Sequence, residues 1–267
     1  MPRASLPSLA LRLRPALRGA ALPALLLALW WAALHWHWTR SPLLVPIDQV
    51  WQTAVAQSTS GELWRALGAS LWRDLLGFAL GAGAGLAFGS ALGLSRRFER
   101  LIGPSFHTLK QISLFAWIPL LSVWFGLGDA AKVVFLSLAA FFPVVLNTFE
   151  GIRSVPADLV EVGRVFGFSR WQMLRRVVWP AALPSVFAGI HLGLIYAWLA
   201  TLGAEYLLVS GQGIGNTLID GRETFRMDLV LFGVIVVGLV GFALNWLAGL
   251  LETQLLGWRG RTAGQRR

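Results

Sequence analysis

Few side chains in this sequence are of the types that carry out chemistry, and those few stand far apart. The 267 residues include four histidines and no cysteine, so thiolate nucleophiles, disulfides and cysteine metal sites are excluded. His35 and His37 alternate within HWHW without an acidic neighbour, which favours a membrane-interface position over a metal site. His107 and His191 lack the paired histidine or carboxylate spacing of metal or nucleophilic catalysis. We therefore expect neither a bound metal nor an embedded hydrolase.

Hydrolysis of ATP by this chain would require a glycine-rich phosphate loop followed by a lysine. Lys110 and Lys132 are the only lysines, and neither follows such a loop. The segment 211–215, GQGIG, is glycine-rich but lacks a lysine and follows no expected strand. We expect it to form a turn or re-entrant segment, and we expect the chain to be no enzyme and to hold no cofactor.

Carboxylates inside apolar spans commonly form proton or sodium sites, and two lie near the ends of apolar runs. Glu150 ends the fourth run and Glu205 follows the fifth. Glu205 either lines a transport pathway or pairs at a helix end, and the sequence leaves both readings open. Asn147 and Tyr196, on the fourth and fifth runs, are further candidates for a pathway.

The elements that would position these residues are membrane-spanning helices. The chain is 56% hydrophobic and only 13% charged, a composition outside the range of soluble domains. Its apolar runs are long enough to cross a bilayer as helices. We predict an all-α integral membrane protein with six transmembrane helices, at about 20–38, 75–94, 112–127, 131–149, 185–202 and 229–251.

Small residues and prolines inside these runs predict how the helices pack. The second run repeats glycine every four residues, which places five glycines on one helix face and permits close approach of a neighbouring backbone. These are Gly77, Gly81, Gly85, Gly89 and Gly93. Pro119 and Pro143 free backbone carbonyls that must face protein or a water-lined path, so the third and fourth runs are expected to be central.

Positive charge predicts the orientation. The net charge is +10, but the basic residues form no continuous face with aromatic platforms, so nucleic-acid binding is not expected. Arginines and lysines are enriched in cytoplasmic loops. When successive loops are assigned to opposite sides of the membrane, most of the arginines and lysines fall on one side. That side has the amino-terminal arginines, Arg96, Arg97, Arg100, Lys110 and the arginines within 153–176 and 259–267. The other side has Arg40, Arg65, Arg73, Lys132, Arg222 and Arg226.

This charge distribution divides the chain into segments on the two sides of the membrane. We expect residues 1–19 to be cytoplasmic, 20–38 to be a retained anchor, 39–74 to form a periplasmic loop and 258–267 to form a basic cytoplasmic tail. Both termini are then cytoplasmic. Residues 75–257 form a five-helix core that includes a cytoplasmic loop at 150–184.

Within that loop, residues 158–184 form a polar stretch between two apolar runs, here called the motif loop. Pro156 and Asp158 suit the first turn of a helix. Gly167 then breaks the pattern, and Ser169 with Gln172 forms a capping box that starts a second helix. We predict a helical hairpin projecting into water.

The motif loop resembles the conserved loop of permease subunits of bacterial ABC importers. That loop reads E-A-A, three residues, G, nine residues, I-x-L-P, and this chain matches its spacing. The matching positions are Glu161, Val162, Gly163, Gly167, Val177, Trp179 and Pro180. Valine and glycine replace the two alanines, Val177 replaces isoleucine and Trp179 replaces leucine. Residues 60–258 resemble the sulfonate, taurine and nitrate branch, and the aliphatic sulfonate permeases most, through SGELW (60–64), IPLLSVWFGLGDAAK (118–132) and NTFEGIRSV (147–155).

The resemblance implies a type I ABC importer permease fold in the bacterial inner membrane. The motif loop would supply the coupling helix for an ATPase subunit dimer that carries ATP and magnesium. A second permease subunit, in a homodimer, and a periplasmic solute-binding protein would complete the complex. The substrate would be a small organic anion of the sulfonate or taurine type, with nitrate-like solutes as an alternative. An ion-coupled secondary transporter remains the alternative of a different class.

The orientation predicts which introduced cysteines react from outside the cell. Because the chain has no cysteine of its own, single substitutions report one site each. Trp51→Cys and Asp220→Cys should react with a membrane-impermeant thiol reagent in intact cells, whereas Arg170→Cys should react only after the membrane is opened. Labelling of Arg170→Cys in intact cells would overturn the orientation.

Overall fold

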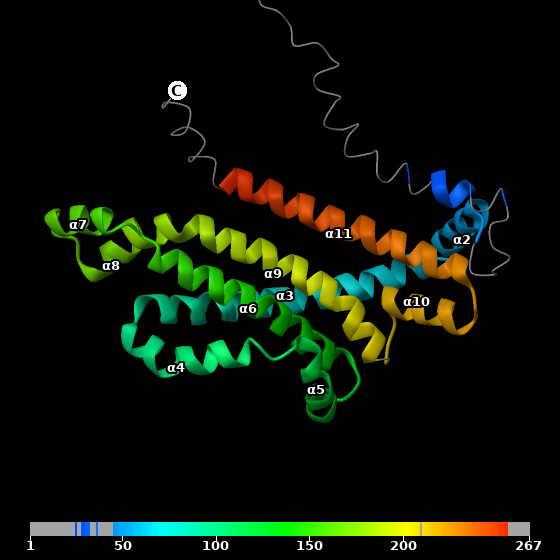
Figure 1. The fold of residues 1–267 in the computed structure, drawn as a ribbon, viewed down its shortest axis with the longest axis horizontal. Coiled ribbons are helices and arrows are strands. Elements are labelled where there is room, and N and C mark those ends of the chain that lie inside the picture. Colours follow the sequence, from blue (N-terminus) through cyan, green and yellow to red (C-terminus); the bar gives the residue numbers. More distant parts are fainter. Residues whose placement is uncertain (1–24, 26–27, 33–35, 37–44, 209, 256–267) are drawn as a thin grey trace, which may run out of the picture.

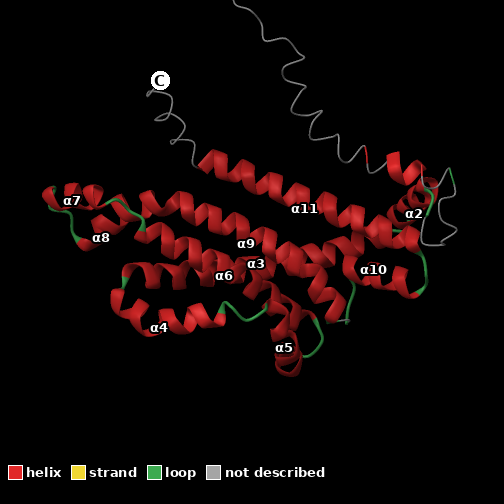
Figure 2. Ribbon diagram, viewed as in Figure 1, coloured by secondary structure: helices red, strands yellow, loops and turns green. Residues whose placement is uncertain are grey.

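Every regular element that the structure describes is helical. A computed structural model describes residues 25, 28–32, 36, 45–208 and 210–255, and short loops join its helices (Figure 2). The helices are α2 (Ile47–Thr59), α3 (Glu62–Leu94), α4 (Arg96–Leu109), a 3₁₀ turn (Leu114–Trp117), α5 (Ile118–Phe125), α6 (Asp129–Arg153), α7 (Ala157–Val165), α8 (Arg170–Met173), a π-helix (Leu174–Val178), α9 (Trp179–Leu207), α10 (Ile214–Glu223) and α11 (Met227–Leu255).

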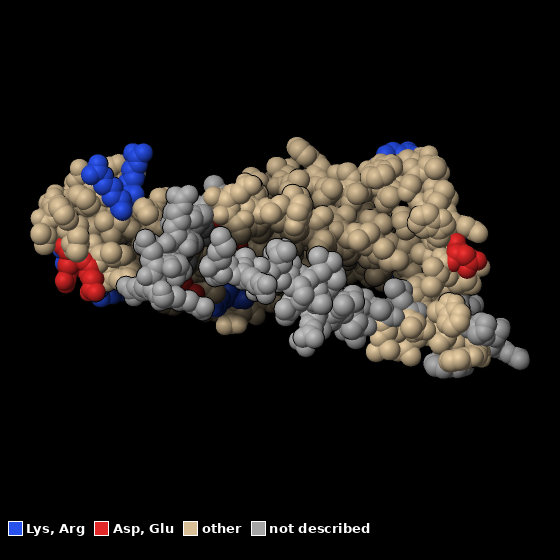
Figure 3. Space-filling model, turned by 90° about the horizontal axis from the view of Figure 1, so that it is seen from above, with Lys and Arg blue, Asp and Glu red and all other residues tan. Residues whose placement is uncertain are grey.

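Helix α6 is the centre of the bundle. It packs along α3 on one side and α9 on another, and α11 lies against α9, α10 and α2 (Figure 1). The motif loop, with α7 and α8, projects at one end of the bundle, here called the loop end. The opposite end, where α6 begins at Asp129, is here called the far end. Charged side chains lie mostly toward the two ends of the face shown in Figure 3, with a largely uncharged band between them.

The glycine repeat of α3 forms its contact with α6. A Cβ atom on Gly85 would lie 2.9 Å from Val144 Cβ, and one on Gly89 would lie 2.7 Å from the Val145 carbonyl oxygen. Added Cβ atoms at Gly77, Gly81 and Gly93 would also collide with α6. Since real Cβ atoms do not approach so closely, only glycine allows this backbone separation. The predicted close packing is confirmed, and its partner is a helix of the same chain.

The described residues contain four helices that are long and apolar enough to cross a membrane. They cover Glu62–Leu94, Asp129–Arg153, Arg170–Leu207 and Met227–Gln254. A fifth crossing is counted if α4 and the segment Leu114–Phe125 form one broken span, since the two are bent by 93°. The predicted first span, 20–38, lies mostly outside the described residues.

The predicted third span, 112–127, is wrong as a single helix. The chain leaves α4 after Leu109, and α5 is only eight residues long. Pro119, predicted to lie inside a span, stands in the first turn of α5, where a missing N–H removes no helical hydrogen bond. Residues 96–109, assigned to a loop because of their arginines, instead form a helix that lies beside the end of α3 and packs Phe106 against Val145 of α6 (Figure 1).

Other helices are longer than their apolar cores predicted. Helix α3 begins at Glu62, so the expected loop at 39–74 contains α2 and the first turns of α3. Helix α9 extends the predicted fifth span at both ends. Arg73 and Lys132, counted as charges of outer loops, lie within α3 and α6, and they are 3% and 0% exposed. Both residues are therefore helical and buried rather than loop residues, although they lie at the end of the bundle opposite the motif loop, as the charge count had placed them.

The glycine contact predicts that a larger side chain at Gly85 separates α3 from α6. Gly85→Leu should destabilise the protein by roughly 1–3 kcal/mol, because overpacking forces side chains and backbone to shift. Gly83 is the matched control, since an added Cβ there meets no atom within 4 Å. Thermal unfolding in detergent measures the effect. Equal melting of Gly85→Leu and Gly83→Leu would contradict the packing role.

Candidate functional site

The motif loop is a helical hairpin that extends beyond the ends of α6 and α9 (Figure 1). Gly167 has φ +68°, a left-handed conformation that favours glycine. The Gln172 amide donates to Ser169 Oγ at 3.3 Å, and the Ser169 amide donates to Gln172 Oε1 at 2.8 Å. The predicted helix, glycine break and capped second helix are therefore confirmed.

Gly163 explains how the two arms of the hairpin pack. It is the buried residue of α7, and an added Cβ would lie 2.8 Å from Met173 Cε. Glycine at this position, where the resembling loops have alanine, makes room for the methionine of α8. Glu161 and Val162, next to it in the motif, are exposed on the outer surface of the hairpin.

The tip of the hairpin is apolar although it projects away from the bundle. Val165 is 88% exposed, Phe166 is 74% exposed and Trp171 is 67% exposed. Exposed apolar patches are typical of surfaces that bind another protein or a membrane. The exposed Arg176 side chain places its guanidinium 5.6 Å from the centre of the Phe168 ring, a contact between the two arms of the hairpin.

The hairpin joins the bundle through a π-helix. Val177 lies in this segment, Leu174–Val178, and Trp179 and Pro180 form the first turn of α9. Trp179 packs on a cluster that includes Ile152 of α6, so the exit of the hairpin rests on both core helices. Single π turns inside helices frequently occur at functional sites.

A second group of polar residues, all buried except the exposed Asp129, lies at the far end and is here called the charge network. It comprises Ser70, Arg73, Asp74, Asp129, Lys132, Thr201 and Glu205. Arg73 donates to Glu205 Oε1 at 2.5 Å, to Asp129 Oδ1 at 2.8 Å and to the Gln212 carbonyl at 2.5 Å. One guanidinium therefore connects α3, α6, α9 and the loop that precedes α10.

Glu205 is the acceptor at the centre of the charge network. It is 1% exposed. Besides Arg73, it accepts from Ser70 Oγ at 2.6 Å and from the Gly215 amide at 2.7 Å. The last contact caps the start of α10, where unpaired amides favour a carboxylate. This geometry supports the pairing role that the sequence left open for Glu205.

The other residues of the charge network add hydrogen bonds between the same helices and the loop before α10. Lys132 Nζ donates to the Ser210 carbonyl at 2.6 Å, and Thr201 Oγ1 donates to Asp74 Oδ1 at 3.2 Å. The glycine-rich segment 211–215 is thus the turn held by the charge network. Sequence reasoning missed Arg73, Asp74 and Lys132, although the spacing of the first two gave a signal. Arg73 and Asp74 follow Ser70 by three and four residues, so each lies next to it on one face of α3; Lys132 had no such signal.

The other pathway candidates lie near the middle of the bundle. Asn147 Nδ2 donates to the Pro143 carbonyl of its own helix at 2.9 Å. Tyr196 is 52% exposed and lines a hollow of about 220 Å³ together with Lys110 and Pro143. His191 Nε2 lies 2.9 Å from Asn245 Oδ1 and Nδ1 lies 3.3 Å from Glu252 Oε2, so it connects α9 to α11. The described residues contain no cluster of metal ligands.

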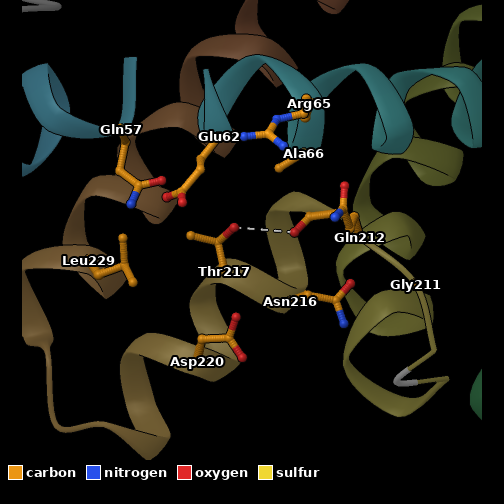
Figure 4. Close-up of a pocket in the computed structure, with 11 residues that line it drawn as sticks. Gln57, Glu62, Arg65, Ala66, Gly211, Gln212, Asn216, Thr217, Asp220 and Leu229 are labelled. Atoms are coloured by element: carbon orange, nitrogen blue, oxygen red, sulfur yellow. Dashed lines mark hydrogen bonds between the residues drawn. The ribbon is translucent and has the colours of Figure 1, made fainter. Parts of the chain in front are cut away.

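A polar hollow of about 320 Å³ opens at the far end between α2, α3, α10 and the glycine-rich turn. In Figure 4, Gln57 of α2 and Glu62 of α3 point toward each other above Thr217 of α10, which donates to the Gly213 carbonyl. Arg65 and Asp220 also line it, so both signs of charge are present. None of the three pathway candidates predicted from the sequence, Asn147, Tyr196 and Glu205, lines this hollow.

Comparison with known proteins agrees with this architecture. Residues 79–256 match the family described as binding-protein-dependent transport system inner membrane component. The chain is 38% identical to the putative aliphatic sulfonates transport permease protein SsuC of Bacillus subtilis, over 93% of this chain and 90% of the relative. It is 36% identical to SsuC of Escherichia coli, over 89% and 90%. It is 30% identical to the taurine transport system permease protein TauC of Escherichia coli, over 89% and 88%.

Solved structures show the same fold at low identity. A chain of the inward-facing MetNI methionine ABC transporter superposes with a TM-score of 0.62 at 18% identity, covering 74% of this chain and 98% of that one. A chain of an amino acid ABC transporter gives 0.62 at 17% identity, covering 76% and 97%. The matched core, the all-helical fold and the close relatives agree, and the chain belongs to the inner membrane permease family of binding-protein-dependent ABC transporters.

Proposed function

We propose that this protein is the permease subunit of an ATP-driven ABC importer for a small organic anion of the aliphatic sulfonate or taurine type. It passes the solute from the periplasm to the cytoplasm, and a separate ATPase subunit supplies the energy. The substrate class rests on the SsuC and TauC relatives, which are named for sulfonates and taurine.

The observation that carries the proposal is the exposed apolar tip of the motif loop. Helix α7 projects beyond the bundle (Figure 1), and Val165 and Phe166 at its end are largely exposed. Exposed aromatic side chains of this kind anchor protein interfaces when a partner buries them. We assign this surface to the ATPase dimer, which holds ATP and magnesium.

The motif residues then have distinct roles in coupling. Glu161 and Val162 face the ATPase from α7, while Gly163 and Gly167 set the shape of the hairpin. Val177, Trp179 and Pro180 connect the hairpin to α9. Because the helix is continuous from Arg170 to Leu207, movement of the hairpin tilts α9 directly.

The remaining partners follow from the orientation. With the motif loop and both termini in the cytoplasm of a bacterial cell, the far end faces the periplasm and receives the solute-binding protein. The polar hollow beside Gln57, Arg65 and Asp220 (Figure 4) is on that surface. A second copy of this chain completes the permease pair. An ion-coupled carrier is not favoured, because both Glu205 oxygens are already hydrogen-bonded by protein groups.

Coupling predicts a strong effect of Gly167→Val. A side chain in the left-handed conformation costs roughly 1–2 kcal/mol, so the hairpin should lose its shape while the long helices stay packed. Uptake of ethanesulfonate in vesicles with all partners should fall, and ATP hydrolysis should cease or proceed without transport.

Gly61 is the matched control for strain alone. It has φ +77° with no atom within 4 Å of an added Cβ, but it precedes α3 rather than lying in the motif loop. Gly61→Val should retain coupled uptake. Full coupled activity in Gly167→Val would contradict the coupling role, and uptake driven by an ion gradient alone would favour a secondary transporter.

The apolar tip predicts a second effect. Phe166→Asp should weaken binding of the ATPase about tenfold or more, because a buried aromatic anchor is replaced by a charge. Stability should change little, since Phe166 is mostly exposed. Phe225, 81% exposed in the loop between α10 and α11, is the matched control. Copurification of the ATPase measures the loss, and equal binding by Phe166→Asp and Phe225→Asp would refute the assignment.

A further inference from the structure

Lys110 lies near the middle of the bundle rather than in a loop at its end. It follows α4, a helix of 14 residues that spans about 21 Å at 1.5 Å per residue. Helix α4 starts beside the loop end of α3 and runs back along the bundle, so that it ends near the middle (Figure 1). The chain then bends by 93° before α5. The sequence had grouped Lys110 with the cytoplasmic charges.

The Lys110 side chain lines the hollow of about 220 Å³ on the surface of α6 and α9. Pro143 and Tyr196, from the middle portions of these two helices, line it as well. Its other walls are apolar and include Ile112, Leu114 and Phe142. The hollow therefore combines one ammonium group, one phenol hydroxyl and an apolar surface.

No other charge lies at this depth among the described residues. The middle of each long helix has no aspartate, glutamate, lysine or arginine, as shown by the stretches 75–94, 133–149, 179–204 and 229–251. Lys110 is half-buried, and none of the ion pairs within the described part of the chain includes it. An unpaired ammonium is costly in lipid, so such residues face water or a ligand.

The residues around Lys110 indicate water rather than lipid. His107, Thr108, Gln111 and Ser113 are all exposed on the end of α4 and the bend. Hydrocarbon would leave these polar groups and the non-helical backbone of the bend without hydrogen-bond partners. This surface of the bundle therefore faces water or another protein subunit rather than lipid.

We propose that Lys110 and Tyr196 form an anion subsite on the translocation pathway. The ammonium group binds the oxygens of a small oxyanion such as a sulfonate, and the Tyr196 hydroxyl donates a second hydrogen bond. The apolar walls contact the alkyl part of the solute. This assignment rests on the proposed import of an organic anion, and it places the solute midway through the permease. A lipid phosphate is the other source of the same chemistry.

Cysteine labelling tests the subsite without any transport. Tyr196→Cys in the full chain, in phosphatidylcholine vesicles, should react faster with the anionic reagent sulfonatoethyl methanethiosulfonate than with its trimethylammonium analogue. Butanesulfonate should slow this reaction. Adding Lys110→Gln should abolish both the anion preference and the protection. Leu239→Cys, 63% exposed on α11, is the lipid-facing control and should stay unreactive.

Uptake provides an independent measurement. In vesicles with all partners, Lys110→Gln should lower ethanesulfonate uptake about tenfold, as expected for loss of one charge-assisted contact, while Lys110→Arg keeps most of it. Arg97→Gln, an exposed charge at the start of α4, should have no effect. If the wild-type complex imports no sulfonate but labelling shows the anion preference, the proposed import fails and the subsite stands.

Three results would overturn the subsite itself. The first is an unreactive Tyr196→Cys, which would place this surface in lipid. The second is an anion preference that persists in Lys110→Gln. The third is protection by phosphatidylglycerol but not by butanesulfonate, which would identify a lipid headgroup as the ligand.

Discussion

The ion pair between Arg73 and Glu205 is the contact on which the far end of the bundle depends. Both side chains are almost completely buried, and burial of charges is compensated only when their hydrogen-bonding groups are satisfied. The structure meets most of this requirement by bringing Asp129, Ser70, a loop carbonyl and the amide of Gly215 to the pair, which leaves only Arg73 Nε of the guanidinium without a hydrogen bond. Four segments are thus fixed relative to one another because the two charges need all of them.

The charge network and the motif loop lie at opposite ends of the same helix. Helix α9 has 29 residues, about 43 Å at 1.5 Å per residue, and it contains Glu205 near one end and Trp179 at the other. Its centre packs on α6, which in turn lies against the glycine face of α3. Because packed interiors resist compression, the proposed coupling requires that a tilt of the motif loop move α9 as a unit. The π-helix at Leu174–Val178 is the point where the hydrogen-bond pattern changes before that rigid section begins.

Sequence patterns correctly predicted the features that depend on residues close together in the sequence. The capping box at Ser169, the left-handed Gly167 and the glycine face of α3 follow from spacing within one or two helical turns. The burial of Arg73 could not be read in this way, since its partner Glu205 is 132 residues away in the sequence. Counting charges by side of the membrane treated Arg73 and Lys132 as loop residues, because the rule does not consider tertiary pairing. The bend after Lys110 was missed because Pro119 was taken as a residue inside one span, whereas it stands in the first turn of a separate helix.

The charge network and Lys110 differ in whether their hydrogen-bonding groups are available to a solute. Arg73, Lys132 and Glu205 direct their hydrogen bonds to protein groups, so a solute would have to displace contacts that hold the helices together. Lys110 has no ion-pair partner within the described ranges, and its hollow is open and mostly apolar. A pathway requires binding that is favourable enough for entry and weak enough for release. A single ammonium beside one hydroxyl satisfies that requirement better than the charge network, whose charges already contact protein groups, and it lies about midway between the loop end and the far end.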